Sequence, residues 1–162
     1  VISGIGHPLL GPDHLLFLLA IALVGLRQPR RWVLPLLALG LGGSLVSQLV
    51  PLPSALETAA EACVSLTLVL EGLVILGRLP VWLLLPAISL HGCLLGGAVI
   101  GAEPAPLLAY GLGLLIGQGV LLLAVTGVSS RLLEGVGSNG RQIAAGVWIG
   151  IGAAFTWSLL VP

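Results

Sequence analysis

The sequence predicts an all-α integral membrane protein, a bundle of about six transmembrane helices forming a single polytopic domain over residues 1–162. Hydrophobic residues make up 57% of the chain and charged residues only 7%, against about a quarter in soluble domains. Folded in water, such a chain would expose a large apolar surface. The net charge of zero, without a basic stretch, excludes the charge pattern of a nucleic-acid-binding protein.

Six apolar runs each approach the length of about 20 residues that a spanning helix needs. Turns rich in proline, glycine or polar residues separate the runs, and proline cannot continue a helix. The expected spans are Ile5–Leu26, Val33–Val50, Ala59–Leu76, Val81–Ile100, Leu107–Val128 and Gln142–Val161. Small residues four apart allow helices to pack closely in lipid. The glycine pairs with this spacing are Gly92/Gly96, Gly97/Gly101, Gly113/Gly117 and Gly146/Gly150.

The arginines predict the orientation, because all of them fall in the first, third and fifth loops. They are Arg27, Arg30, Arg31, Arg78, Arg131 and Arg141. The positive-inside rule makes these loops cytoplasmic and places both termini outside. An outside N-terminus without a preceding charge or initiator Met indicates a removed signal peptide. We expect a multi-pass protein of the bacterial plasma (inner) membrane.

The first expected span carries His7, Asp13 and His14. An ionisable group inside a membrane costs about 2.5–3.5 kcal/mol on insertion scales, so residues of this kind are candidates for a functional site. The two histidines are two helical turns apart and can face the same way. Gly11-Pro12 lies between them and predicts a break in the helix that re-aims Asp13. The alternative is that the histidines are hydrogen-bonded core residues.

The third expected span carries Glu57, Glu61 and Glu71, and the fourth carries His91. The three carboxylates share an arc of about 80° on one helix face, which is typical of a polar path. Two alternatives remain open: a buried acid on this face that is bonded to Ser, Thr or backbone, and Glu57 as a charge favoured by the helix dipole. No arginine is expected inside the membrane, so an ionised interior needs a cation or protons.

Imidazole together with carboxylate suits Ni²⁺, Co²⁺, Cu²⁺ or Zn²⁺. The chain has no Met and only two Cys, so it offers few of the sulfur ligands that a Cu(I) path would need. A borderline divalent transition metal is therefore the expected ligand, and the chemistry does not choose among these ions.

Gly6-His-Pro-Leu-Leu-Gly-Pro-Asp-His14 resembles the HPxxGxDH signature of the HupE/UreJ proteins, small six-helix membrane proteins regarded as nickel or cobalt permeases. Glu61 to Gly72 is similar to their third-helix segment, and Leu90-His-Gly92 to their fourth-helix motif FHGxAHGxE. The resemblance covers essentially the whole chain.

The resemblance implies that His7, Asp13, His14 and His91 handle the metal. The chain departs from the fourth-helix motif, with Leu95 in place of the second His and Ala98 in place of the Glu. We hypothesise that acidic residues elsewhere supply the missing oxygen ligands. The candidates are Glu71, Glu61 and Glu103.

The sequence thus predicts a permease, not an enzyme, for Ni²⁺ or Co²⁺ as transported substrate, with uptake toward the cytoplasm and no organic cofactor. The expected partners are the metal cation and the lipid bilayer, with no nucleic acid. A homo-oligomer and a supply of metal to nickel-enzyme maturation are left open. The alternatives are a non-transporting membrane accessory protein and an intramembrane metalloenzyme with an open metal position.

Overall fold

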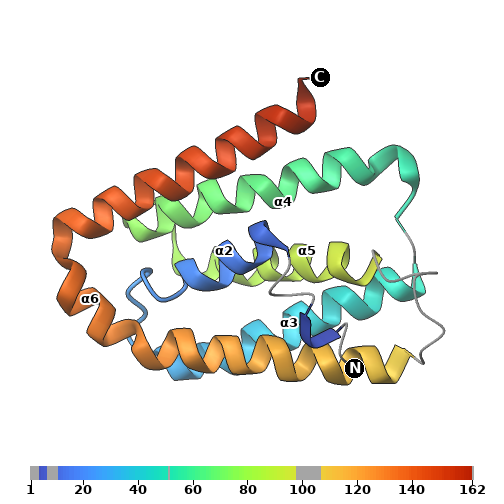
Figure 1. Ribbon diagram of the computed structural model, residues 1–162, viewed down its shortest axis with the longest axis horizontal. Helices are drawn as coiled ribbons and strands as arrows, with labels where there is room; N and C mark the ends of the chain where they lie inside the picture. Colours follow the sequence, from blue (N-terminus) through green and yellow to red (C-terminus); the bar gives the residue numbers. More distant parts are fainter. Residues whose placement is uncertain (1–3, 7–10, 51, 98–106, 162) are drawn as a thin grey trace.

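The computed structural model describes residues 4–6, 11–50, 52–97 and 107–161, and the regular structure in these ranges is helical throughout. This confirms the all-α class. The elements are α2 (Pro12–Ala20), α3 (Pro29–Leu49), α4 (Ser54–Ile75), the 3₁₀ turn η1 (Val81–Leu83), α5 (Leu84–Gly97) and α6 (Leu107–Leu160). Successive helices run back and forth along the long axis of the molecule (Figure 1).

Three of the described helices are long and apolar enough to cross a membrane: Pro29–Leu49, Ser54–Ile75 and Leu108–Leu160. A further apolar helix, Val81–Gly96, is shorter. A run of about 20 apolar residues favours burial in lipid, and a helix satisfies its backbone hydrogen bonds there. The exact number of crossings and the side on which the termini lie stay predictions.

The prediction of a fifth loop over residues 129–141 is wrong for most of that segment. The structure keeps this segment helical within α6, except at Gly137, where φ is 65° and ψ is −176°. The chain turns sharply there and divides α6 into a first arm (107–136) and a second arm (138–160) (Figure 1). The segment holds Gly, Ser and Asn but no Pro, and a helix tolerates each such residue at a cost of about 1 kcal/mol or less.

The first expected span is shorter than predicted. Its helix α2 has 9 residues, begins at Pro12 after the N-cap Gly11, and ends before a turn over residues 21–23. A helix start at Gly11-Pro12 agrees with the sequence, since proline fits the first helical turn and fixes the start there. Residues 7–10 lie outside the described ranges, so a break in a longer helix stays a prediction. A helix of this length extends about 14 Å, roughly half of a bilayer core, so α2 alone does not cross.

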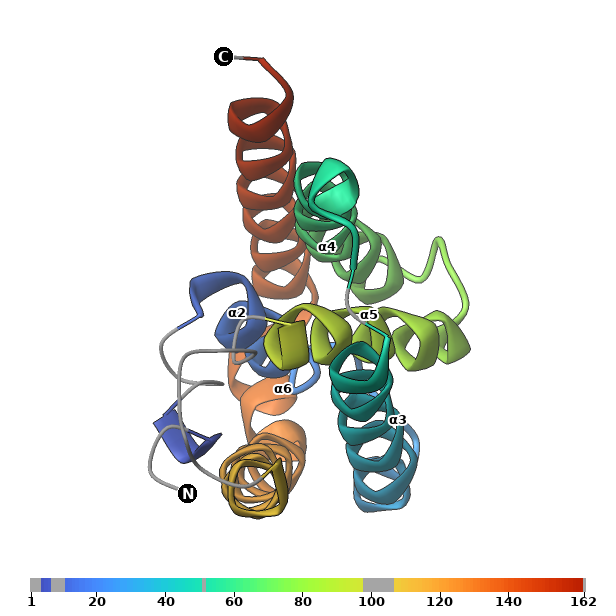
Figure 2. The same ribbon diagram turned by 90° about the vertical axis from the view of Figure 1, so that its right-hand side faces the viewer.

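The helices form three layers, best seen along the molecule (Figure 2). One outer layer holds α4 and the second arm of α6, and the other holds α3 and the first arm. The middle layer holds α2 and α5, which are covered on both sides. Its side chains Phe17, Leu18 and Ile88 are fully buried and belong to the main hydrophobic cluster. The histidines that these two helices carry, His14 and His91, are buried in this layer.

The prediction that glycines four apart allow close helix packing holds for one described pair and not for another. A Cβ on Gly92 would collide with the backbone carbonyl of Gly40, and one on Gly96 with that of Ser44. This pair therefore lets α5 and α3 approach closely, as predicted. A Cβ on Gly146 or Gly150 would instead meet no described atom within 4 Å, and both residues are exposed on the second arm. Their spacing serves no contact between described helices.

The connections that carry arginine lie together at one end of the molecule. The α2–α3 connection, the α4–α5 connection and the turn in α6 share this end in Figure 1. Arg141, which follows the turn in α6, donates from Nη2 to the carbonyl oxygens of Val24 in the α2–α3 connection at 3.4 Å and of Ile75 at the end of α4 at 3.2 Å. The three arginine-bearing segments thus share one end of the molecule. Their common location on the cytoplasmic side of a membrane stays a prediction.

Candidate metal site

Two of the predicted metal-handling histidines meet in the middle layer. His14 lies in the first turn of α2 and His91 in α5, and both are buried. Their ring centroids are 5.3 Å apart, with ring planes at 59°. Pro12 sets the position of His14 by fixing where α2 begins. Asp13, beside His14, is half-buried.

His91 is held from two further helices. The ring of Phe17, on α2, lies 4.5 Å from the His91 ring, centroid to centroid. From a third helix, Thr67 of α4 places its Oγ1 2.7 Å from His91 Nε2. The same Thr67 hydroxyl donates to the carbonyl of Val64 at 2.6 Å. Thr67 is absent from the predicted site residues, although its spacing of four from Glu71 places both on one face of α4.

Glu71 lies one turn beyond Thr67 and is completely buried. Neither of its carboxyl oxygens has a hydrogen-bond partner among the described residues. The alternative of a buried acid bonded to Ser, Thr or backbone therefore finds no support in the described part of the chain. An unpartnered buried polar group costs about 1–3 kcal/mol, so Glu71 does not contribute to stability through hydrogen bonding.

Glu61 and Glu57 lie in a different environment from Glu71, because both are exposed on the first half of α4. Ten residues, about 15 Å along the axis, separate Glu61 from Glu71. The described helices cover the second half of α4 and leave its beginning open. Glu57 occupies the first turn, which matches the alternative of a charge favoured by the helix dipole. A path shared by all three carboxylates stays a prediction.

The rest of the predicted ligand set is not assembled by the described residues. His7 and Glu103 lie outside the described ranges. Within those ranges, no group of three or more His, Cys, Asp and Glu side chains is placed to hold a metal ion. The structure therefore brings together His14 and His91, and further ligands at His7, Asp13, Glu71 or Glu61 stay predictions.

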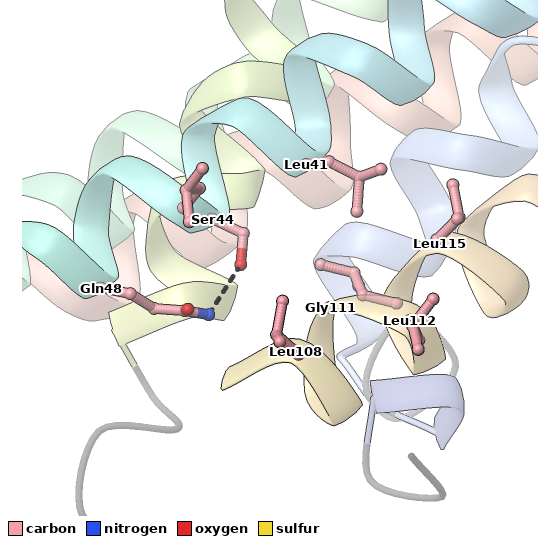
Figure 3. Close-up of a pocket in the computed structure, with 9 residues that line it drawn as sticks. Leu41, Ser44, Gln48, Leu108, Gly111, Leu112 and Leu115 are labelled. Carbon is pink, nitrogen blue, oxygen red and sulfur yellow. Dashed lines mark hydrogen bonds between the residues drawn. The ribbon is translucent and has the colours of Figure 1, made fainter. Parts of the chain in front are cut away.

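A pocket of about 300 Å³ lies elsewhere, between α3 and the first arm of α6 (Figure 3). Leucine side chains from both helices line it, and Gln48 and Ser44, joined by a 3.4 Å hydrogen bond, form its polar edge. None of the predicted metal residues that the structure describes lines this pocket. Its apolar lining does not suit a divalent cation.

A family model described as HupE / UreJ protein matches residues 1–155. The chain belongs to the HupE/UreJ family. A search of curated proteins and a search of solved structures gave no match. The HupE/UreJ family is associated with nickel or cobalt transport, or with urease and hydrogenase maturation, and is a family of transporters and accessory proteins not known as enzymes. Together with its apolar helices, the family places this chain in a membrane.

The structure also shows the surroundings of Leu95, which stands in this HupE/UreJ chain where the fourth-helix motif has its second histidine. Leu95 is buried there against Tyr110 and Leu114 of the first arm. Its carbonyl oxygen accepts a hydrogen bond from the Tyr110 hydroxyl at 3.2 Å. The position has become part of a small apolar cluster, so Leu95 supplies no ligand. The other departure, Ala98, lies outside the described residues.

Proposed function

We propose that this HupE/UreJ protein is a membrane permease that carries a divalent transition-metal cation, nickel or cobalt, toward the cytoplasm. One observation supports the proposal above all others. Two buried histidines from separate helices, His14 and His91, lie with ring centroids 5.3 Å apart in a layer shielded on both sides. Imidazole nitrogen is a preferred ligand of both metals, and ionisable groups inside a membrane mark ion pathways.

The spacing of the two rings suits a shared ion. An ion bonded to an imidazole nitrogen at about 2.1 Å lies about 3.2 Å from the ring centroid. Two rings on one ion then have centroids roughly 4.5 to 6.4 Å apart, depending on the angle at the metal. The observed 5.3 Å falls inside this range. The separation of the two ring centroids is therefore compatible with two imidazoles on one cation.

The direction of the helices suggests an order for the path. Helices α2 and α4 both run toward the arginine-bearing end, which we take as cytoplasmic (Figure 1). In the proposal, Asp13 and His14 receive the cation near the start of α2, with His7 as the further ligand that the sequence predicts. The cation then passes His91, and Glu71 offers an oxygen ligand one turn beyond Thr67. Glu61, on the exposed half of α4, gathers cations at the entrance.

The test is metal accumulation in cells that express the chain, measured by mass spectrometry for Ni, Co, Zn, Mn and Cu. We expect selective accumulation of nickel or cobalt. His14→Ala, His91→Ala and the double variant His7→Ala/Asp13→Ala should each reduce accumulation by at least about tenfold, because each removes a ligand or its neighbour. Leu19→Ala, at an exposed position of α2, is the control and should leave accumulation unchanged.

The variants are compared at equal membrane abundance, so that loss of assembly is not mistaken for loss of transport. Unchanged accumulation in both His14→Ala and His91→Ala would contradict the proposal. If the chain accumulates no metal but is needed for urease or hydrogenase activity, the accessory role replaces transport. That outcome would agree with the second association of the HupE/UreJ family.

A further inference from the structure

Three helices of two layers meet at the His91 ring. Helix α5 carries His91, α2 contributes the Phe17 ring, and α4 contributes the Thr67 hydroxyl. Thr67 is buried, and its oxygen contacts both His91 Nε2 at 2.7 Å and the Val64 carbonyl oxygen at 2.6 Å. A hydroxyl group has a single hydrogen. The direction in which that hydrogen points decides which nitrogen of His91 carries a proton.

The short oxygen–oxygen distance settles the direction. Two oxygens 2.6 Å apart repel unless a hydrogen lies between them, and this distance is ordinary for an O–H···O hydrogen bond. The carbonyl of Val64 has no hydrogen, so the Thr67 hydroxyl must provide it. Having donated to Val64, the Thr67 oxygen accepts from His91. The hydrogen between Thr67 and His91 therefore belongs to Nε2.

A neutral imidazole has one N–H and one nitrogen with a free lone pair. With Nε2 protonated, the lone pair is on Nδ1, and only a nitrogen with a lone pair can bind a metal ion. We propose that Thr67 is a positioning residue that fixes His91 as the Nε2–H tautomer and thereby presents Nδ1 to the cation. The inference rests on the proposed function for its metal, while the tautomer stands on the hydrogen-bond geometry alone.

The surroundings of Thr67 favour such a role. Its side chain is β-branched and bonded to its own helix, so the hydroxyl has little freedom to turn away. Phe17 packs on the His91 ring at 4.5 Å between centroids and limits its rotation. Helix α5 is itself held close to α3, where Gly92 next to His91 packs against Gly40. A metal-bound histidine in proteins usually donates its other N–H to an oxygen, and losing that oxygen typically weakens metal binding about 10- to 100-fold.

The first test measures metal uptake against metal concentration in cells. Thr67→Val keeps the shape of the side chain but removes the oxygen, and we expect the concentration for half-maximal uptake to rise about 10- to 100-fold. Thr67→Ser restores a hydroxyl and should restore uptake to near the wild-type level. Thr126→Val is the matched control, since the hydroxyl of this buried threonine bonds to carbonyls of its own helix, those of Leu122 and Leu123. It should leave uptake unchanged.

The second test reads the tautomer directly. The purified chain, labelled with ¹⁵N in its histidine rings, is examined by NMR in mildly alkaline buffer without metal, and the His91→Gln variant identifies the His91 signals. We expect a protonated Nε2 and an unprotonated Nδ1 in the wild type, and a mixture of tautomers in Thr67→Val. A wild-type His91 protonated at Nδ1 would overturn the inference, whether or not the valine variant folds.

The two tests separate this inference from the proposed function. If His91→Ala abolishes uptake but Thr67→Val behaves like the wild type, transport stands and the positioning role is wrong. A second outcome is that no variant changes uptake, while His91 is the Nε2–H tautomer in the wild type and a mixture of tautomers in Thr67→Val. In that case Thr67 sets the tautomer, and the permease proposal fails. A loss of uptake in Thr67→Ser as large as in Thr67→Val would also contradict the inference.

Discussion

Glu71 places a carboxyl group inside the bundle where no described residue offers it a hydrogen bond. The residue that follows, Gly72, packs against Ala145 and Ile149 of the second arm, so α4 and α6 meet closely at this level. Burying a polar group without a partner is unfavourable, and an apolar residue of similar size would avoid the cost. A buried side chain that lowers the stability of the fold is a candidate for a functional role.

We predict that Glu71→Leu separates stability from activity. Removing the unpartnered carboxyl should leave the unfolding free energy unchanged or raise it by about 1–3 kcal/mol. The same change should lower metal uptake, because it removes a proposed oxygen ligand. Thermal unfolding in detergent and uptake in cells measure the two effects.

Glu134→Leu is the control for Glu71→Leu, since Glu134 is exposed on the first arm. This variant should leave uptake as it is. A marked destabilisation by Glu71→Leu would show that the carboxyl has a structural partner, and the separation of roles would then be wrong.

At the scale of the elements, Gly137 decides the shape of the last third of the chain. Its φ of 65° with ψ of −176° lies in a region that is essentially restricted to glycine. A Cβ at this position would meet no described atom within 4 Å, so the backbone conformation alone requires glycine. Without this turn, the two arms would continue in one direction, and the second arm would not lie along α4.

Gly137→Ala should therefore destabilise the protein by about 1–3 kcal/mol, the usual cost of a strained backbone conformation. The matched control is Gly135→Ala, two residues earlier in regular helix and also in open space. There, alanine should be neutral or stabilise by roughly 0.5–1 kcal/mol, because it lowers the entropy cost of forming helix.

Thermal unfolding midpoints of the purified Gly137 and Gly135 variants give the comparison. Equal midpoints for the two variants would mean that the turn in α6 does not depend on the conformation of Gly137.

At the scale of the whole molecule, hydrophobic runs predicted α3, α4, α5 and the two arms, and Pro12 predicted where α2 begins. The sequence could not predict which neighbours cover each helix face. Periodicity places Glu61 and Glu71 on one face of α4, yet only the second half of that face is covered. The His14–His91 contact could be expected from motifs, whereas the bond of Thr67 to His91 depends on how α4 and α5 pack.

The arrangement predicts how the protein is oriented in the membrane. Gln28 lies in the arginine-bearing α2–α3 connection, and Leu52 lies in the α3–α4 connection at the opposite end; neither is fully buried. In a chain freed of Cys63 and Cys93, Leu52→Cys should react with a membrane-impermeant thiol reagent in spheroplasts. Gln28→Cys should react only after the membrane is permeabilised.

Labelling of Gln28→Cys from outside, with Leu52→Cys protected, would reverse the assigned orientation. The proposed direction of transport would then have to be reversed as well.

The hydrogen bonds of Arg141 have a consequence for the order of assembly. The carbonyl partners, in Val24 and Ile75, precede the arginine by 117 and 66 residues. A chain is synthesised from its N-terminus. Most of it has therefore been made before the Arg141 guanidinium is available to bond to the first helices. Until then, the carbonyl at the end of α4 and the carbonyl of the α2–α3 connection lack this donor. The second arm of α6 therefore supplies this donor last, and we expect chains truncated before residue 141 to be degraded sooner than the full chain.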